Sequence, residues 1–368
     1  MQFKPTSDHV RISGRCTRYE DILYLGFSGS FIEFTMQGTK LTVTFVTDDP
    51  VMREDPKSEW YRPEVSYCDD TYYGQVAILL DGNKEIHERI ALTSPRMTRQ
   101  IQLSDKEEMH TVRIVKLNEA AFGQVGIDEL ETDTQAPVLP TKPLDRRIEF
   151  VGDSITCGYG NEGVNEVDIY STHQQNPLDA YAILTADALK AEYQLVSWSG
   201  IGIITNYIPE TEDEPREEIL MPQLYPYRDR RFNERKGLPL TEWDFSQYQP
   251  HVIVMFLGTN DASYTRRKPE REAYFGGEFE KFLGTLHEKN PESAILCILG
   301  TMEESLCDEE QKRVDSFAAA HPEVQIEFLR LPLQDNADGI GTDGHPSKTT
   351  HAKVAKLVSD KLKSMMKW

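Results

Sequence analysis

Ser154 stands directly after an apolar run, in the stretch RRIEFVGDSITCGYGNEG that begins at Arg146. A serine hydroxyl in this position has two ordinary uses. It caps the helix that follows, or it attacks a carbonyl carbon once a base removes its proton. The stretch departs from the G-x-S-x-G elbow of α/β-hydrolases, because Thr156 occupies the place of the second glycine. Taken alone, Gly-Asp-Ser favours the helix cap.

Three further motifs follow apolar runs and supply groups that a reactive serine needs. In SWSGIGI, Gly200 and Gly202 allow backbone N–H groups to approach a ligand closely. In FLGTND, the side-chain amide of Asn260 can donate a hydrogen bond to an oxyanion. In GTDGHPSKTTH, Asp343 precedes His345 by two residues and could hold its imidazole in the tautomer of a general base. Each motif also occurs in ordinary turns, but together the four indicate acyl transfer by a serine nucleophile.

The elements that must position these motifs lie in the second half of the chain. Its apolar runs are continuous, which is typical of strands buried on both faces: RIEFVGD, YQLVSWSG, HVIVMFLGTND, AILCILGT and VQIEFLRL. Helical patterns alternate with these runs, and Ser347 is the expected N-cap of the last helix. The alternation predicts an α/β three-layer sandwich with a parallel sheet, whose carboxyl edge gathers ligands. A polar and aromatic insertion at 205–245 is expected to fold over that edge.

The first half, residues 1–131, has a different pattern. Apolar and polar residues alternate on both sides of Gly38-Thr39, and again around Asp81-Gly82-Asn83, so we expect a β-hairpin at each turn. Many short strands with no helical period predict an all-β sandwich of the jelly-roll type. The proline-bearing stretch TDTQAPVLPTKPLD predicts a linker at 132–145, which leaves 146–368 as the catalytic domain.

The charge composition limits the classes of molecule that this protein is expected to bind. The chain has 368 residues with 40 Lys and Arg against 61 Asp and Glu, a net charge of −21. This charge repels phosphate backbones and anionic membrane surfaces, so we expect no nucleic-acid or membrane partner and a neutral substrate. The sequence leaves assembly into a homo-oligomer open.

Redox state and location are also predicted from the sequence. The N-terminal residues lack a signal-peptide pattern and no apolar run is long enough to span a bilayer, so we expect a cytoplasmic protein, secreted only if a leader has been removed. The cysteines show no C-x-x-C or Cys/His clustering, which predicts reduced thiols and no metal or cofactor site. They are Cys16, Cys68, Cys157, Cys297 and Cys307.

The four motifs resemble those of the SGNH hydrolases, a family named for Ser, Gly, Asn and His, over residues 146–366. The resemblance implies Ser154 as nucleophile and His345 as general base. It further implies an oxyanion hole made by the Ser154 N–H, the Gly202 N–H (with Gly200 as the alternative) and the Asn260 side chain.

Two details depart from the common family pattern. Ser197 stands where the second motif commonly begins with asparagine, and the last motif is D-x-H rather than D-x-x-H. With GDSITCGYGNEG, SGIGI and DGHPS behind an all-β domain, the chain resembles the family-two carbohydrate esterases. These are two-domain SGNH enzymes that remove O-acetyl groups from xylan and glucomannan.

This second resemblance implies an acetylated oligosaccharide or polysaccharide as substrate and no cofactor. Asp343 would complete a triad, but some members orient the histidine through a backbone carbonyl, so both arrangements stay open. Substrate contacts are expected at Asp153, Tyr159 and Asn161. Aromatic residues of the insertion either contact the substrate as well or pack the insertion against the core, and both roles stay open. Those aromatic residues are Tyr207, Tyr225, Tyr227 and Trp243. Two other functions remain open: an SGNH lipase or thioesterase, and a non-catalytic carbohydrate-binding protein.

Overall fold

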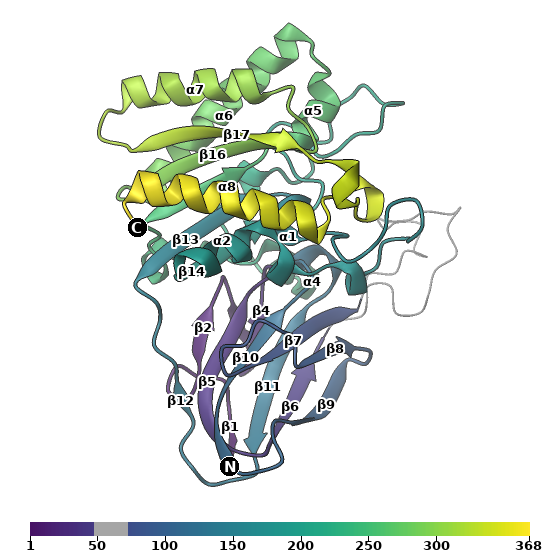
Figure 1. Ribbon diagram of the computed structural model, residues 1–368, viewed down its shortest axis with the longest axis vertical. Coiled ribbons are helices and arrows are strands. Elements are labelled where there is room, and N and C mark those ends of the chain that lie inside the picture. Colours follow the sequence, from purple (N-terminus) through teal and green to yellow (C-terminus); the bar gives the residue numbers. More distant parts are fainter. Residues whose placement is uncertain (48–72) are drawn as a thin grey trace. The chain divides into compact units, whose positions relative to one another are not determined.

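The computed structural model describes residues 1–47 and 73–368 (Figure 1). They form two compact units. One comprises Met1–Pro143 together with Tyr170–Leu178 and Asp229–Leu240, and the other comprises Leu144–Ile169, Asp179–Arg228 and Thr241–Trp368. The stretch predicted as a linker contains strand β12 (Leu139–Pro140), which pairs with β5 (Phe31–Gly38).

Two antiparallel sheets make up most of the first unit. One has the strand order β3 (Thr17–Tyr19), β4 (Ile22–Leu25), β11 (Val125–Thr132), β6 (Lys40–Val46), β9 (Arg96–Gln102), with β1 (Gln2–Phe3) beside β11. The other has the order β12, β5, β10 (Glu108–Lys116), β7 (Gly74–Leu80), β8 (Glu88–Leu92), with β2 (Arg11–Ser13) beside β5. Both sheets contribute side chains to one apolar core, as the predicted sandwich requires: Phe34, Phe45, Ile78 and Ile127 are examples. The jelly-roll connectivity stays a prediction.

The two predicted hairpins have different outcomes. β7 and β8 pair as predicted, and Asp81 and Gly82 adopt φ values of 57° and 74° in the turn between them. The hairpin at Gly38 is wrong, because β5 and β6 belong to different sheets. Alternation shows only that each strand has one buried face, and a crossing from one sheet to the other buries those faces equally well. The Asp133 carboxylate holds this crossing by accepting hydrogen bonds from the Thr39 N–H and hydroxyl.

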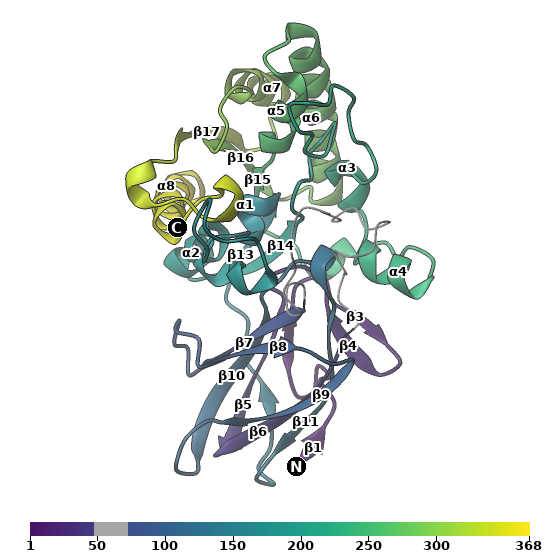
Figure 2. The same ribbon diagram turned by 90° about the vertical axis from the view of Figure 1, so that its right-hand side faces the viewer.

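A parallel sheet lies at the centre of the second unit. Its order is β14 (Ala191–Ser197), β13 (Arg146–Gly152), β15 (Val252–Phe256), β16 (Ala294–Thr301), β17 (Ile326–Leu333). Helix α2 (Tyr181–Leu189) packs against α8 (Lys348–Met366) on one face, and α6 (Pro269–Lys289) packs against α7 (Cys307–Ala320) on the other (Figure 2). The predicted α/β three-layer sandwich is confirmed. The strand order reverses direction between β13 and β15, and open α/β sheets bind ligands at such a point.

Shorter helices complete the described part of the chain. They are α1 (Ser154–Cys157), α3 (Met221–Leu224), α4 (Arg230–Lys236) and α5 (Thr259–Thr265), with 3₁₀ turns at η1 (Ala120–Phe122), η2 (Thr172–Gln174), η3 (Pro177–Asp179), η4 (Phe245–Gln247), η5 (Asn336–Asp338) and η6 (Thr342–Gly344). The Ser347 side chain accepts a hydrogen bond from the Thr350 N–H, which confirms the predicted cap of α8.

Two further predictions concern the redox state of the cysteines and the presence of a membrane-spanning segment. Cys16, Cys157, Cys297 and Cys307 are free thiols, and Cys68 lies outside the described residues. Over the ranges 1–47 and 73–368, the structure has no helix with the length and apolar character needed to cross a bilayer.

Candidate active site

Three of the predicted motifs directly follow strands of the parallel sheet, and the fourth leads into α8, the last helix of the chain. Ser154 is the first residue of α1 after β13, Gly202 lies in the loop after β14, and Asn260 is in the first turn of α5 after β15. His345 follows η6 and precedes α8. The carboxyl ends of parallel strands share one edge, so these short connections bring together groups that are far apart in sequence.

Ser154 and His345 form a direct hydrogen bond. The serine Oγ lies 2.8 Å from Nε2 of the imidazole, and Nδ1 lies 3.1 Å from the Thr342 carbonyl oxygen. A carbonyl only accepts hydrogen bonds, so the proton of the neutral ring sits on Nδ1 and leaves Nε2 free to accept from the serine. Burial lowers the pKa of His345 below its usual 6.5, against the opposing influence of the Thr342 carbonyl and the Asp343 charge. The geometry is that of a neutral base beside a serine hydroxyl.

Asp343 does not occupy the position that a triad predicts. Its carboxylate accepts a hydrogen bond of 2.8 Å from the Tyr159 hydroxyl, while Nδ1 of His345 faces the Thr342 carbonyl instead. Asp343 has a left-handed φ of 54° within η6. This tight turn places the Thr342 carbonyl within hydrogen-bond distance of the His345 imidazole. The Tyr159 ring lies against the His345 ring, with centroids 4.5 Å apart. Asp343 therefore acts on Tyr159, which flanks the imidazole.

The predicted oxyanion donors lie in the three connections that follow β13, β14 and β15. The Asn260 amide donates to the Ile201 carbonyl at 2.8 Å and lies 3.3 Å from the Asp153 carboxylate. This ties the loop after β14 to the first turn of α5. Within the described ranges, the backbone N–H groups of Ser154 and Gly202 have no protein acceptor, so both are available to an oxyanion.

Asp261 is a buried residue that sequence reasoning missed. Its Oδ1 accepts hydrogen bonds from the backbone N–H groups of Ile203, Ile204 and Thr205, at 2.9, 2.7 and 3.3 Å. Burial raises the pKa of this carboxyl to about 6, although the three N–H groups oppose the shift. The sequence does contain a signal for it, because Asp261 is the last residue of the FLGTND motif and directly follows Asn260.

Gly202 fits closely under the same carboxylate. A Cβ at this position would lie 2.2 Å from the Thr205 carbonyl oxygen and 2.7 Å from both carboxylate oxygens of Asp261. Gly200 has a left-handed φ of 79° and open space where a Cβ would be. Gly202 therefore has no space for a side chain, whereas Gly200 has space but a backbone conformation that favours glycine.

The predicted substrate contact at Asp153 is wrong, because this side chain has no solvent-exposed surface. Its Oδ1 caps α1 by accepting from the Ile155 N–H at 3.0 Å, and burial raises its pKa to about 7. Tyr159 and Asn161 are also buried, with exposed fractions of 9% and 4%. The Tyr159 hydroxyl is used by Asp343. The buried residues next to Ser154 thus support the site through contacts with other protein groups.

The aromatic residues of the insertion separate into two groups. Tyr225 is fully buried and donates to the Glu149 carboxylate at 2.6 Å, and Trp243 is also buried. Tyr227 is partly exposed, and Tyr207 is 56% exposed. Tyr207 lines a cavity of about 630 Å³ together with Thr259, Ala262, Arg266 and Glu303. Thr259 and Ala262 flank Asn260 on α5, so the cavity lies beside the predicted oxyanion donor.

Comparison with known proteins agrees with the geometry. Residues 150–353 match the GDSL-like lipase/acylhydrolase family, and the chain belongs to this family. Solved structures of family-two carbohydrate esterases are among its structural neighbours.

The similarity extends over nearly the whole chain. It is 28% identical over 348 residues to cellulase/esterase CelE of Acetivibrio thermocellus, covering 93% of this chain and 38% of that protein. It is 26% identical to an acetylxylan esterase / glucomannan deacetylase of Cellvibrio japonicus, covering 98% of this chain and 90% of the relative. A family-two carbohydrate esterase from Clostridium thermocellum, solved with cellohexaose, has 26% identity and a TM-score of 0.80, with coverage of 98% and 99%.

Proposed function

We propose that this protein is a serine esterase that removes O-acetyl groups from acetylated xylo-, manno- or gluco-oligosaccharides. The observation that carries the proposal is the 2.8 Å contact between Ser154 Oγ and His345 Nε2, with Nδ1 held at a carbonyl. The similarity to acetylxylan esterases and glucomannan deacetylases supports acetylated sugars as the substrate class.

The first half-reaction acylates the serine. His345 Nε2 takes the Ser154 proton as Oγ forms a bond to the acetyl carbonyl carbon. The resulting oxyanion accepts hydrogen bonds from the Ser154 and Gly202 N–H groups and from the Asn260 amide. The bond to the sugar oxygen then breaks, and that oxygen takes the proton from His345. The acetyl group remains on Ser154.

The second half-reaction repeats these steps with water. His345 accepts a proton from the water as its oxygen attacks the acetyl-enzyme, and the same donors hold the second oxyanion. Collapse releases acetate and returns the proton to Ser154 Oγ. In this scheme the Thr342 carbonyl does the orienting work of the triad carboxylate, because it keeps the Nδ1 proton in place.

The sugar is proposed to occupy the cavity beside Asn260. Tyr207 offers an exposed ring on which a pyranose face can pack, and Arg266, Arg267, Glu210 and Glu303 supply polar groups for hydroxyls. A cavity with this lining favours a hydroxylated leaving group over a long acyl chain. The net charge of −21 also suits a neutral oligosaccharide.

Acetate release from acetylated xylo- and manno-oligosaccharides tests the proposal, with wild type beside Ser154→Ala. We expect release by wild type and none by Ser154→Ala. Ser347→Ala is the matched control, since it removes a serine hydroxyl that caps α8 and touches no reacting group. Comparing p-nitrophenyl acetate with p-nitrophenyl octanoate adds the acyl specificity. A preference for octanoate would replace the proposal with a lipase-type function.

A further inference from the structure

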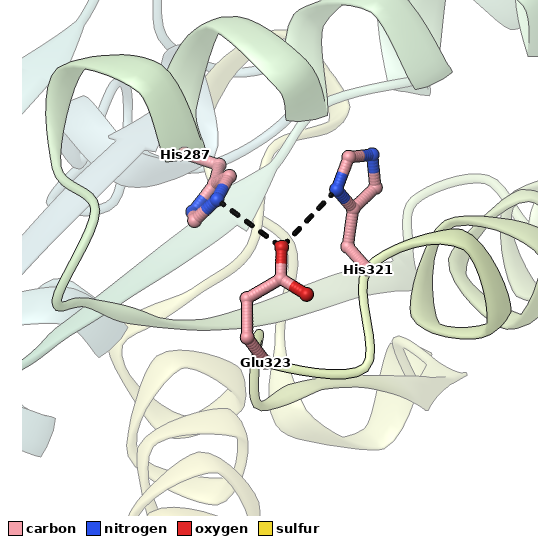
Figure 3. A group of neighbouring side chains, drawn as sticks. All are labelled: His287, His321 and Glu323. Carbon is pink, nitrogen blue, oxygen red and sulfur yellow. Dashed lines mark hydrogen bonds and ion pairs between the residues drawn. The ribbon is translucent and has the colours of Figure 1, made fainter.

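Two histidines and a glutamate meet in one group (Figure 3). The group lies at the amino edge of the parallel sheet, where α7 ends and β17 begins, whereas Ser154 follows the carboxyl end of β13. His287 lies in the last turn of α6, His321 caps the C-terminus of α7, and Glu323 lies in the loop that leads into β17. Separations of 34 and 2 residues along the chain hide the group from any local motif. The fold alone brings the three side chains together.

The spacing of the three side chains suits a small metal ion. The Glu323 Oε1 lies 3.8 Å from His287 Nε2 and 3.4 Å from His321 Nδ1, and one atom of each residue lies within 4.8 Å of the other two. Zn²⁺ bonds of about 2.1 Å at tetrahedral angles separate their ligand atoms by about 3.4 Å. The two distances to Glu323 Oε1 are close to this spacing, so side-chain rotations that also bring the two imidazoles together would place three ligand atoms around one ion.

The surroundings of the group also favour a cation. The C-terminal ends of α6 and α7 both lie here, and unpaired carbonyls at helix C-termini carry partial negative charge. The Glu323 carboxylate, which lies within 4 Å of both imidazole rings, adds a formal negative charge. The His321 ring stacks on Phe317 with centroids 4.3 Å apart, which holds the ring in place before any ion binds.

Exposure of the ligands leaves room for a water molecule. The exposed fractions of the side chains are 22% for His287, 42% for His321 and 61% for Glu323. A tetrahedral ion with three protein ligands here keeps its fourth position open to solvent. Imidazole and carboxylate ligands select zinc and neighbouring transition metals over Mg²⁺ and Ca²⁺, which prefer oxygen ligands alone.

We propose that His287, His321 and Glu323 form a binding site for a divalent ion of the zinc class, which links the C-terminal ends of α6 and α7. The site lies at the opposite sheet edge from Ser154 and takes no part in the esterase chemistry. Its effect is on the stability of the parallel-sheet unit, because an ion that binds only the folded chain stabilises it.

Titration of the chelator-treated full-length chain with Zn²⁺ tests the site, with calorimetry for binding and thermal unfolding for stability. Wild type should bind one ion and show a higher Tm as Zn²⁺ is added. His321→Ala and Glu323→Gln should each weaken the affinity by about a hundredfold or more, because each removes one of three ligands. Co²⁺ should give a visible absorption band typical of tetrahedral coordination in wild type and lose it in both variants.

Two controls keep the result interpretable. His173→Ala removes an exposed histidine of the other compact unit and should leave the Zn²⁺ response unchanged. Hydrolysis of p-nitrophenyl acetate should be the same in wild type and in both site variants, so the metal site stands or falls separately from the proposed esterase. An unchanged Tm in wild type, or an equal rise of Tm in wild type and His321→Ala, would overturn the proposal.

Discussion

The two edges of the parallel sheet hold their histidines in different ways. At the carboxyl edge, His345 bonds through both ring nitrogens to neutral oxygens, those of Ser154 and Thr342, and burial lowers its pKa. At the amino edge, His287 and His321 share the carboxylate of Glu323 and remain partly exposed. A buried histidine beside neutral acceptors stays neutral and can act as a base, whereas two histidines that share a carboxylate offer three ligand atoms to a metal ion.

Removal of the reacting groups gives the largest expected difference between the edges. Ser154→Ala and His345→Ala should each lower kcat by about 10⁴-fold or more, since each abolishes the proton transfer that activates the serine. His321→Ala, at the other edge, should leave kcat unchanged. Steady-state hydrolysis of p-nitrophenyl acetate measures all three. Equal losses in His345→Ala and His321→Ala would break the comparison.

Loss of one oxyanion donor should have the next largest effect. Asn260→Ala is expected to lower kcat by about 10²–10³-fold with a smaller change in KM, because the donor acts chiefly on the developing charge. Ser347→Ala serves as the control: it should cost about 1 kcal/mol of unfolding free energy through loss of a helix cap while kcat is kept. A kcat for Asn260→Ala within threefold of wild type would remove Asn260 from the oxyanion hole.

Substitution of Asp261 tests whether its buried hydrogen bonds to the Gly202 loop are needed for activity. Asp261→Ala leaves three backbone N–H groups without their acceptor, and misplacement of the Gly202 loop should lower kcat by about 10²-fold. Asp261→Asn keeps an oxygen at the position of Oδ1, so it should restore most of kcat. Unfolding in denaturant, measured alongside kcat, separates lost stability from lost positioning. Equal activity of the two variants would show that these hydrogen bonds do not position the loop.

Asp343 should matter much less than a triad aspartate. Because the Thr342 carbonyl already holds Nδ1 of His345, Asp343→Ala should lower kcat by less than about tenfold, against about 10⁴-fold for loss of a triad carboxylate. Tyr159→Phe removes only the hydroxyl that Asp343 accepts from, and it should reproduce this small effect. A loss near 10⁴-fold in Asp343→Ala alone would restore the triad.

The pH profile gives the smallest expected effect, a shift rather than a loss. Protonated His345 cannot accept the serine proton, so kcat/KM should rise with pH as the imidazole loses its proton. Because burial lowers the pKa of His345, the midpoint of this rise should lie below 6.5. His321→Ala should leave the midpoint in place. A midpoint above 6.5 would mean that a carboxylate, and not a carbonyl, dominates the surroundings of the imidazole.

Much of the second unit could be predicted from the sequence because strands buried on both faces have continuous apolar runs. These runs gave the strands of the parallel sheet, and a parallel sheet gathers its carboxyl ends at one edge. The order Ser154, Gly202, Asn260, His345 along four strand ends therefore predicted their proximity. The same reasoning predicted the cap of α8 at Ser347, since that hydroxyl acts on backbone four positions or fewer away.

Other features depend on contacts that the sequence does not encode locally. The hairpin at Gly38 fails because the partners of β5 and β6 come from distant strands. Asp343, two residues before His345, could reach the imidazole or turn away, and only the left-handed backbone of η6 decides between them. Asp153 is polar and next to the nucleophile, yet its complete burial makes it a helix cap and not a sugar contact.

The chain passes between the two compact units five times, because Tyr170–Leu178 and Asp229–Leu240 belong with the β sandwich. Arg89 donates to the backbone carbonyls of Thr172 and Gln175, and the Phe232 ring packs on Tyr24. Recombination between relatives at a single breakpoint near residue 143 would separate these partners. Only exchanges that carry both later segments together with the first 143 residues keep each unit whole. A cut after residue 143 would therefore not yield two complete modules.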